Sequence, residues 1–354
     1  MDSESLQDRI TARQVQLERL KAAVGKEYVK TVLPYVNELA KEIAGREDEL
    51  SEGTQKAVKE LQSDVRRQMG EAIDEANTQF TKTAEGLAPE SQRNAKQDVV
   101  RGAGGFIKNS AIGTLKNEQL VRQVMNKPIQ ATGQLFPEML AEFKASETRK
   151  MNRVITRGIV SGQSNREIAQ AIRGTVSLNR RDGQAAKLER AAQTMTSTAI
   201  QHVDSTSKLA LYRNNKDILS GYEFNAVLDR KTSSVCKGLD GEVFPLEKKG
   251  TPQPPIHPNC RSTLLPIVKG LEDTDDTRAS ETGATKAKDY FTWLKRQPKK
   301  VQFDALGKER AEIFRSKNMT AKKFKQLSYN RNFEPLTLDE MKKKAGKLGY
   351  DLPE

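Results

Sequence analysis

Both cysteines of this chain and one of its two histidines lie in one short stretch, where side chains able to bind a metal are concentrated. Cys236 is followed by His257 and Cys260, and Asp229 precedes them. Thiolate sulfur, imidazole nitrogen and carboxylate oxygen are donors that Zn²⁺ accepts in tetrahedral sites. Because cysteine and histidine are scarce here, their clustering indicates that one site uses them together. The sequence therefore predicts a structural zinc site with Cys236, His257, Cys260 and Asp229 as ligands.

The loop around His257 is rich in proline. Pro254, Pro255 and Pro258 restrict the backbone on both sides of the histidine. A restricted loop loses less conformational freedom when it holds a ligand. Two other interpretations stay open. One is a metal-free polar cluster in which His257 and Asp229 hydrogen-bond to backbone groups, and the other is a catalytic site or a disulfide.

The same stretch resembles the signature of the phage Mu protein F-like minor head proteins, also called head morphogenesis proteins. The residues that carry the resemblance are Asp229, Thr232, Cys236, Leu239-Asp240-Gly241 and Pro254-Pro255-Ile256-His257-Pro258-Asn259-Cys260-Arg261. A second similar block contains Tyr290, Trp293, Leu294, Gln297, Pro298, Leu306, Gly307 and Arg310. The motif positions to which we give a structural role are Thr232, Asp240, Gly241, Pro255, Arg261 and Trp293.

Two of these motif residues allow more than one interpretation. Arg261 either pairs with Asp229 or Asp240 or contacts DNA. Trp293 is expected to pack with Tyr290 on one helical face in a small core, and the alternative is that it stacks on a nucleic-acid base.

A looser helical block, residues 162–213, is also similar to the family upstream of the signature. It has a Gly-x-Ser turn, a short helix and a long helix rich in threonine and alanine. Where family members commonly carry Arg-Thr-Glu early in the long helix, this chain has Gln193-Thr194-Met195-Thr196-Ser197-Thr198. No role of that glutamate is therefore transferred to this chain.

The resemblance implies a minor capsid protein that takes part in head morphogenesis of a tailed bacteriophage. Such proteins associate with the portal protein, and with scaffold and major capsid proteins, inside the head. They contact packaged double-stranded DNA without sequence preference during assembly or ejection. We therefore expect the protein in the virion, in the head interior, and in the host cytoplasm during assembly. Two alternatives stay open: a metal-dependent nuclease or toxin-type enzyme built on a Mu F-like domain, and a non-specific DNA-binding regulator.

We do not expect an enzyme. The sequence contains no Gly-x-x-x-x-Gly-Lys-Ser/Thr motif, which argues against a packaging ATPase. A catalytic zinc needs an open coordination position and a neighbouring general base, and no paired carboxylates flank His257. His202 lies in a predicted helix whose neighbours indicate only packing.

The composition is that of a polar helical protein. Of 354 residues, 36% are hydrophobic, 5% are aromatic and 30% are charged. No run approaches the roughly 20 apolar residues of a membrane span, and residues 1–8 lack the pattern of a secretory signal. Two cysteines give no indication of an oxidising compartment. We expect no membrane span and a cytoplasmic working environment.

The net charge of +13 is unevenly distributed. Residues 1–100 hold 15 Lys and Arg against 19 Asp and Glu, whereas residues 284–354 hold 18 against 9. A basic C-terminal region indicates an anionic partner, most simply nucleic acid, although a solvated lysine-rich surface has the same composition. The residues predicted to contact DNA are Lys295, Arg296, Lys299, Lys300, Lys342, Lys343 and Lys344.

Helices are expected over most of the chain because apolar residues recur at three- and four-residue spacings. The predicted helical ranges are 4–100, 135–160, 165–173 and 185–213. Pro34 should break or kink the first range, and Ser164 with Glu167 has the spacing of a capping box.

β-Structure is expected only around the cysteines. Residues 222–228 and 262–268 are predicted strands, and Asp240-Gly241 predicts a hairpin turn. The predicted fold is mainly α, with extended N-terminal helices, an α+β core containing a small β-hairpin and Cys-His knot, and a basic helical C-terminal region. The expected domains are a helical arm or bundle (1–104), a Mu F-like head morphogenesis domain (105–270), a polar linker (271–283) and the basic C-terminal region (284–354).

Overall fold

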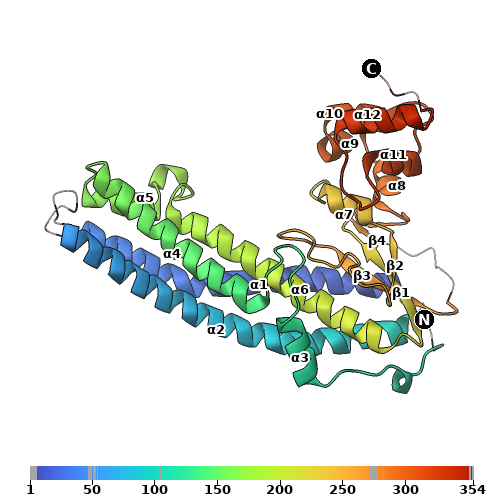
Figure 1. Ribbon diagram of the computed structural model, residues 1–354, viewed down its shortest axis with the longest axis horizontal. Helices are drawn as coiled ribbons and strands as arrows, with labels where there is room; N and C mark the ends of the chain where they lie inside the picture. The colour runs from blue at the N-terminus through green and yellow to red at the C-terminus, as the bar shows by residue number, and fades with distance from the viewer. Residues whose placement is uncertain are drawn as a thin grey trace. The chain divides into compact units, whose positions relative to one another are not determined.

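The computed structural model is mainly helical, with a small antiparallel sheet (Figure 1). It describes residues 6–46, 50, 53, 55–103, 105–271, 278–281, 283–350 and 352. The long helices are α1 (Leu6–Ala44), α2 (Gln55–Gly102), α4 (Phe136–Val160) and α6 (Gln184–Asn214). The short helices in the same part of the chain are η1 (Asn109–Ala111), α3 (Asn117–Met125), α5 (Asn165–Arg173) and η2 (Val176–Leu178).

The remaining elements follow α6. The strands are β1 (Leu219–Asn225), β2 (Val243–Pro245), β3 (Thr263–Val268), β4 (Arg278–Ser280) and β5 (Gly283–Thr285). The helices are α7 (Ser234–Leu239), α8 (Tyr290–Lys295), α9 (Lys299–Leu306), α10 (Lys308–Arg315), α11 (Ala321–Ser328) and α12 (Leu338–Lys347). The predicted fold class, mainly helical with a small β component beside a Cys-His group, is confirmed.

Contacts divide the chain into two compact units. Unit 1 spans Met1–Leu17, Glu90–Leu120 and Asp204–Glu354, and unit 2 spans Glu18–Pro89 and Val121–Val203. The boundaries fall inside α1, α2, α3 and α6. The domain boundaries at 104, 270 and 283 stay a prediction. Continuous ranges could not describe unit 1, because three separate segments build it.

Helix α1 is not broken at Pro34. The proline lies on the exposed face, while Val32 and Val36 on either side of it are fully buried. A proline removes one backbone hydrogen bond, and on a solvent-facing side the freed carbonyl can bond to water. Burial of the opposite face therefore maintains the helix.

Unit 2 is an assembly of helices around an aromatic group. Tyr28 of α1 meets Phe80 of α2 and Phe143 of α4 edge to face, with ring centroids 6.1 and 5.7 Å apart. The Tyr28 hydroxyl lies 2.7 Å from the Asn77 side-chain oxygen. The predicted capping box is confirmed where α5 begins: Ser164 Oγ accepts from Glu167 N at 3.3 Å, and the Glu167 carboxylate accepts from Ser164 N at 2.8 Å.

Unit 1 contains a three-stranded sheet, in the order β2-β1-β3 with both pairs antiparallel, and a two-stranded antiparallel sheet of β4 and β5. Tyr222 at the centre of β1 pairs with Phe244 on one side and Pro266 on the other. Alternate residues of β1, including Tyr222 and Phe224, are fully buried. The buried face packs with both cysteines in one hydrophobic cluster, so this sheet is the support of the predicted metal-binding stretch.

The C-terminal helices α8–α12 share a second hydrophobic cluster in unit 1. Trp293 is 1% exposed, and its ring lies 5.3 Å from that of Tyr290, which confirms that this pair packs in a small core. Among the helices that the structure describes, none is long and apolar enough to cross a membrane.

Candidate metal centre

Cys236 lies in the first turn of α7, not on a strand. Ser233 is the N-cap of this helix, and its hydroxyl accepts a hydrogen bond from Cys236 N at 3.3 Å. Serine is favoured at this position because its oxygen satisfies an amide that has no partner inside the helix. At Gly238 an added Cβ would lie 2.6 Å from the Tyr329 ring. The cap and this close approach fix the direction of the Cys236 side chain.

His257 and Cys260 are held in the loop between β2 and β3. Cys260 N donates to the His257 carbonyl at 3.2 Å, and Asn259 between them has a left-handed φ of 57°. The loop reaches this turn through a cis peptide bond between Pro254 and Pro255. The proline-rich sequence thus gives a closed turn that presents the imidazole and the second thiol together.

The three donors converge. Cys236 Sγ lies 3.8 Å from Cys260 Sγ and 3.2 Å from His257 Nε2, and the three ligand atoms all lie within 4.8 Å of one another. Two Zn–S bonds of about 2.3 Å at a tetrahedral angle place their sulfurs roughly 3.8 Å apart. The donor set and its spacing therefore fit a tetrahedral Zn²⁺.

The imidazole is oriented by a second contact. His257 Nδ1 lies 2.8 Å from the Pro258 carbonyl oxygen, so a proton on Nδ1 is donated there and Nε2 faces the thiols. Metal-binding histidines are commonly oriented in this way, with the other ring nitrogen donating to a carbonyl.

Hydrogen bonds within the group shift the pKa values of its three side chains in different directions. The pKa of the Cys260 thiol is held well below its usual range, first because the Cys236 thiol donates to it, and also because of His257. The same hydrogen bond and burial raise the pKa of Cys236 well above its usual range. The hydrogen bond with Cys260 also raises the pKa of His257. The lowered pKa of Cys260 favours its thiolate, which is the form of cysteine that binds metals.

Asp229, which the sequence predicts as the fourth ligand, is engaged elsewhere. Its Oδ2 accepts from Arg261 Nη1 at 2.6 Å, and its Oδ1 accepts from Arg261 Nη2 at 2.9 Å. Oδ1 also accepts from the Thr232 hydroxyl and from Lys231 N, both at 3.0 Å. The structure therefore brings together three of the four predicted ligands, and it shows Arg261 paired with Asp229.

The Leu239-Asp240-Gly241 motif is a structural turn, but it does not join two strands. It joins α7 to β2, and Gly241 has a φ of 76°, which glycine adopts without strain. Gly241 N donates to the Phe224 carbonyl on β1 at 2.9 Å. The predicted hairpin at this turn is therefore wrong, because residues 234–239 form a helix that is capped by Ser233.

Arg278 is a buried residue beside the Asp240 turn that no sequence pattern predicts. It lies in the predicted polar linker, where residues 272–277 and 282 are outside the described residues, yet it is 5% exposed. Its Nη2 and Nη1 donate to the Asp240 carboxylate at 2.6 and 3.0 Å. An arginine beside several acidic and hydroxyl residues has the sequence pattern of a solvated loop, so no local signal distinguished it.

The predicted DNA-contacting residues are of two kinds. Lys295, Arg296 and Lys344 donate to backbone carbonyls of their own region, and Lys300 pairs with Asp304 at 2.9 Å. Lys299 lies over the Phe303 ring, with Nζ 5.2 Å from the ring centroid. Lys342 and Lys343 are exposed on α12.

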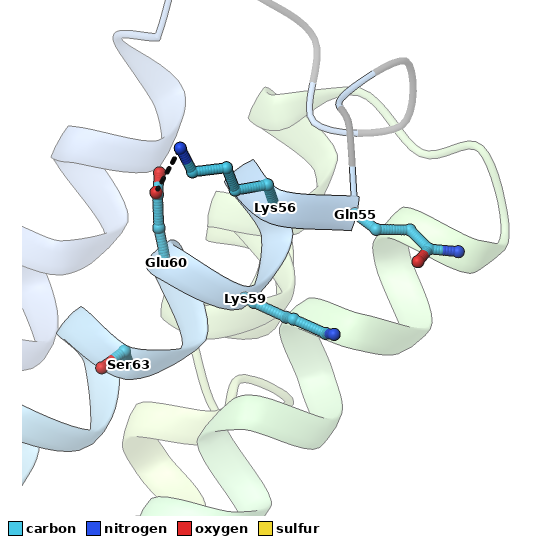
Figure 2. A pocket seen from close by; sticks show the side chains of 5 residues that line it. All are labelled: Gln55, Lys56, Lys59, Glu60 and Ser63. Atoms are coloured by element: carbon cyan, nitrogen blue, oxygen red, sulfur yellow. Dashed lines mark ion pairs between the residues drawn. The ribbon is translucent and has the colours of Figure 1, made fainter.

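A hollow elsewhere on the surface offers little chemistry. It lies on the first turns of α2, and Figure 2 shows its lining residues, Gln55, Lys56, Lys59, Glu60 and Ser63. Lys56 and Glu60 form an ion pair at 3.9 Å with both side chains largely exposed. Exposed pairs of this kind contribute little energy, so the Cys-His-Cys group is the stronger candidate.

The comparison with known families agrees with this placement. Residues 149–265 match the family model described as phage Mu protein F like protein, which is about a third of the chain. The match begins within α4, ends within β3 and includes all three donors. No curated protein and no solved structure matched the chain.

Proposed function

We propose that this chain, whose residues 149–265 match the phage Mu protein F-like family model, is a minor capsid protein that acts in head morphogenesis of a tailed bacteriophage. The observation that carries the proposal is the coincidence of the family match with the Cys-His-Cys group. All three donors lie within the matched residues, and the fold brings them within 4.8 Å of one another. Long helices suit a protein that works through contacts with other proteins.

The proposed partners are the portal protein, together with scaffold and major capsid proteins, inside the phage head. The family match supports a location in the virion or in its assembly intermediates. The test is mass spectrometry of procapsids and mature virions purified from infected cells, combined with affinity capture of the portal protein. We expect the chain in both particles and in the portal fraction. Recovery from free cytosol alone, with no particle fraction, would refute the proposal.

We further propose that the Cys-His-Cys group holds Zn²⁺ in a structural role. Cys236, His257 and Cys260 would be the protein ligands, and a bound zinc would link α7 to the β2–β3 loop. Metal binding is then coupled to local folding, since the separate segments have no preformed site when unfolded. The fit of the sulfur–sulfur distance, 3.8 Å, supports this assignment.

The DNA contact is proposed for the exposed lysines of the C-terminal region. Lys342 and Lys343 are better placed for it than Lys295, Arg296 and Lys344, whose side chains already donate to backbone carbonyls. Neutralising phosphates releases counterions, so such binding should be independent of sequence and sensitive to salt.

The role is proposed to be non-enzymatic. Asp229, the carboxylate predicted as the fourth ligand, is occupied by Arg261 and is poorly placed to act as a general base. The alternative nuclease is tested by incubating the purified chain with plasmid DNA and Mg²⁺, Mn²⁺ or Zn²⁺. Intact plasmid is the expected result, and cleavage that Cys260→Ser abolishes would establish the enzyme instead.

A further inference from the structure

We infer that a metal held by Cys236, His257 and Cys260 keeps its fourth coordination position open, and that this position binds an external imidazole or thiolate. The inference rests on the metal centre proposed above. With four protein ligands the metal would be fully coordinated by the chain. With three, its fourth ligand can come from another molecule. Three protein ligands with one exchangeable position are a recognised arrangement for zinc.

The first support is the number of donors. Within the described part of the chain, the group that could hold a metal here contains three residues, two buried thiols and one half-buried imidazole. A tetrahedral zinc needs four donors. The fourth must therefore come from a donor outside this group.

The second support is the engagement of Asp229. Its two oxygens accept two hydrogen bonds from Arg261, at 2.6 and 2.9 Å, and two more from Thr232 and Lys231. Turning the carboxylate to the metal would break a bidentate ion pair, which is among the stronger side-chain interactions. The Asp229 carboxylate is thus engaged by Arg261, Thr232 and Lys231, and we infer that Arg261 positions it as a residue that is not a ligand.

The third support is access. Cys236 and Cys260 are 2% and 0% exposed, whereas His257 is only half-buried and its neighbours Pro258 and Asn259 are exposed. The two thiols are therefore shielded from solvent, whereas the loop that carries the imidazole is exposed. An external donor would have to approach along this loop.

The chemical class of the external donor follows from the ion. Zinc is borderline-soft and binds sulfur and imidazole nitrogen well. An imidazole or a thiolate would complete a Cys₂His₂ or Cys₃His set, both of which are common closed tetrahedral sites. The inferred ligand is therefore a single imidazole nitrogen or thiolate sulfur.

The test uses the full chain, freed of metal and loaded with Co²⁺, whose visible bands report coordination. Thiolate-to-cobalt charge-transfer absorption should appear in the parent and be lost in Cys260→Ser. Titration with imidazole, and separately with 2-mercaptoethanol, should then shift the visible cobalt bands until one equivalent is bound. Absence of charge-transfer absorption would overturn the metal centre itself, whereas a bound Co²⁺ whose bands ignore both ligands would overturn only the open position.

Two variants test the part played by Asp229 and Arg261. Asp229→Asn should retain the charge-transfer bands and the response to imidazole, because Asp229 is not a ligand. Arg261→Gln releases the carboxylate and should weaken the response, because Asp229 can then close the site. If imidazole shifts the cobalt bands of Asp229→Asn but not those of the parent, Asp229 is the fourth ligand and the inference is wrong. Circular dichroism of each variant shows whether the helices are retained.

Discussion

Asp240 and Arg278 form a buried ion pair that connects the turn after α7 to strand β4. Asp240 is fully buried, and its Oδ1 accepts from Arg278 Nη2 at 2.6 Å and from Ala226 N at 2.6 Å. Arg278 Nη2 also donates to the Ala226 carbonyl at 2.8 Å. The pair thus satisfies backbone groups at the end of β1 as well as its own charges, so it fixes the turn that leads into β2.

Removing one partner of this pair should destabilise the protein strongly. Arg278→Ala leaves the Asp240 carboxylate buried without its counter-ion, which typically costs about 3–5 kcal/mol. The free energy of unfolding from urea denaturation measures this loss. As a control, Lys41→Ala removes an exposed pair with Glu38 and should change stability by less than about 1 kcal/mol. Equal effects of the two substitutions would show that the buried pair is not structurally important.

The cysteines should control metal content and stability together. Cys236→Ser and Cys260→Ser each remove a proposed zinc ligand, so both should lower the zinc bound per chain, measured by elemental analysis, and the melting temperature. Asp229→Asn should leave the zinc content unchanged, because Asp229 pairs with Arg261. Parent protein that contains no metal when purified without chelator, and cysteine variants as stable as the parent, would favour a metal-free polar cluster.

Acid should destabilise unit 2 through His202. Burial lowers the pKa of this histidine to about 4, and its Nε2 lies 3.0 Å from the Val124 carbonyl oxygen. Because the folded-state pKa lies below the unfolded value, the stability from His202 is fully present above about pH 6.5 and is lost as pH falls toward 4. The loss should approach about 3 kcal/mol.

Urea unfolding at pH 7 and pH 4.5 measures this dependence. His202→Gln keeps a donor for the Val124 carbonyl but does not titrate, so its stability should fall less than that of the parent. Identical losses in the two proteins would assign the acid sensitivity to other groups.

DNA binding should depend on the exposed lysines of α12. Charge reversal with Lys342→Glu and Lys343→Glu should weaken binding to any duplex and reduce the steepness of its salt dependence, by about one unit of the log–log slope per lost phosphate contact. Fluorescence anisotropy between low and high salt checks this. Arg230→Glu, on an exposed side chain paired with Glu281 and Asp304, is the control and should have little effect on DNA binding. Affinity that does not change with salt would leave the lysines as solvated surface.

The helices and the donors were predictable because their signals are local. The capping box of Ser164 and Glu167 and the clustering of Cys236, His257 and Cys260 can be recognised from spacing alone, and the structure confirms both. Helix α7 was missed because it is six residues long and the neighbouring Asp-Gly pair indicates a hairpin.

The partners of charged residues could not be predicted in the same way. The sequence allowed Asp229 to bind a metal, to hydrogen-bond to backbone groups or to pair with Arg261. Its pairing with Arg261 depends on how the β2–β3 loop returns beside it. Arg278 is buried by a long-range contact with Asp240, which no local pattern encodes. The partners of Asp229 and Arg278 therefore depend on the tertiary structure, because each charge is stabilised only when the fold brings its partner close.

Unit 1 is built from three separate segments of the chain, so it cannot complete its folding until the last segment has been synthesised. Gln14 of α1 donates to the Arg261 carbonyl at 2.7 Å, across 247 residues of sequence. The first turns of α1 are made early in synthesis but cannot reach their final contacts until the cysteine-bearing loop has emerged. An expression fragment that starts at residue 105 would lack the whole first segment and part of the second, so the cysteine-bearing region is best produced with the beginning of the chain attached.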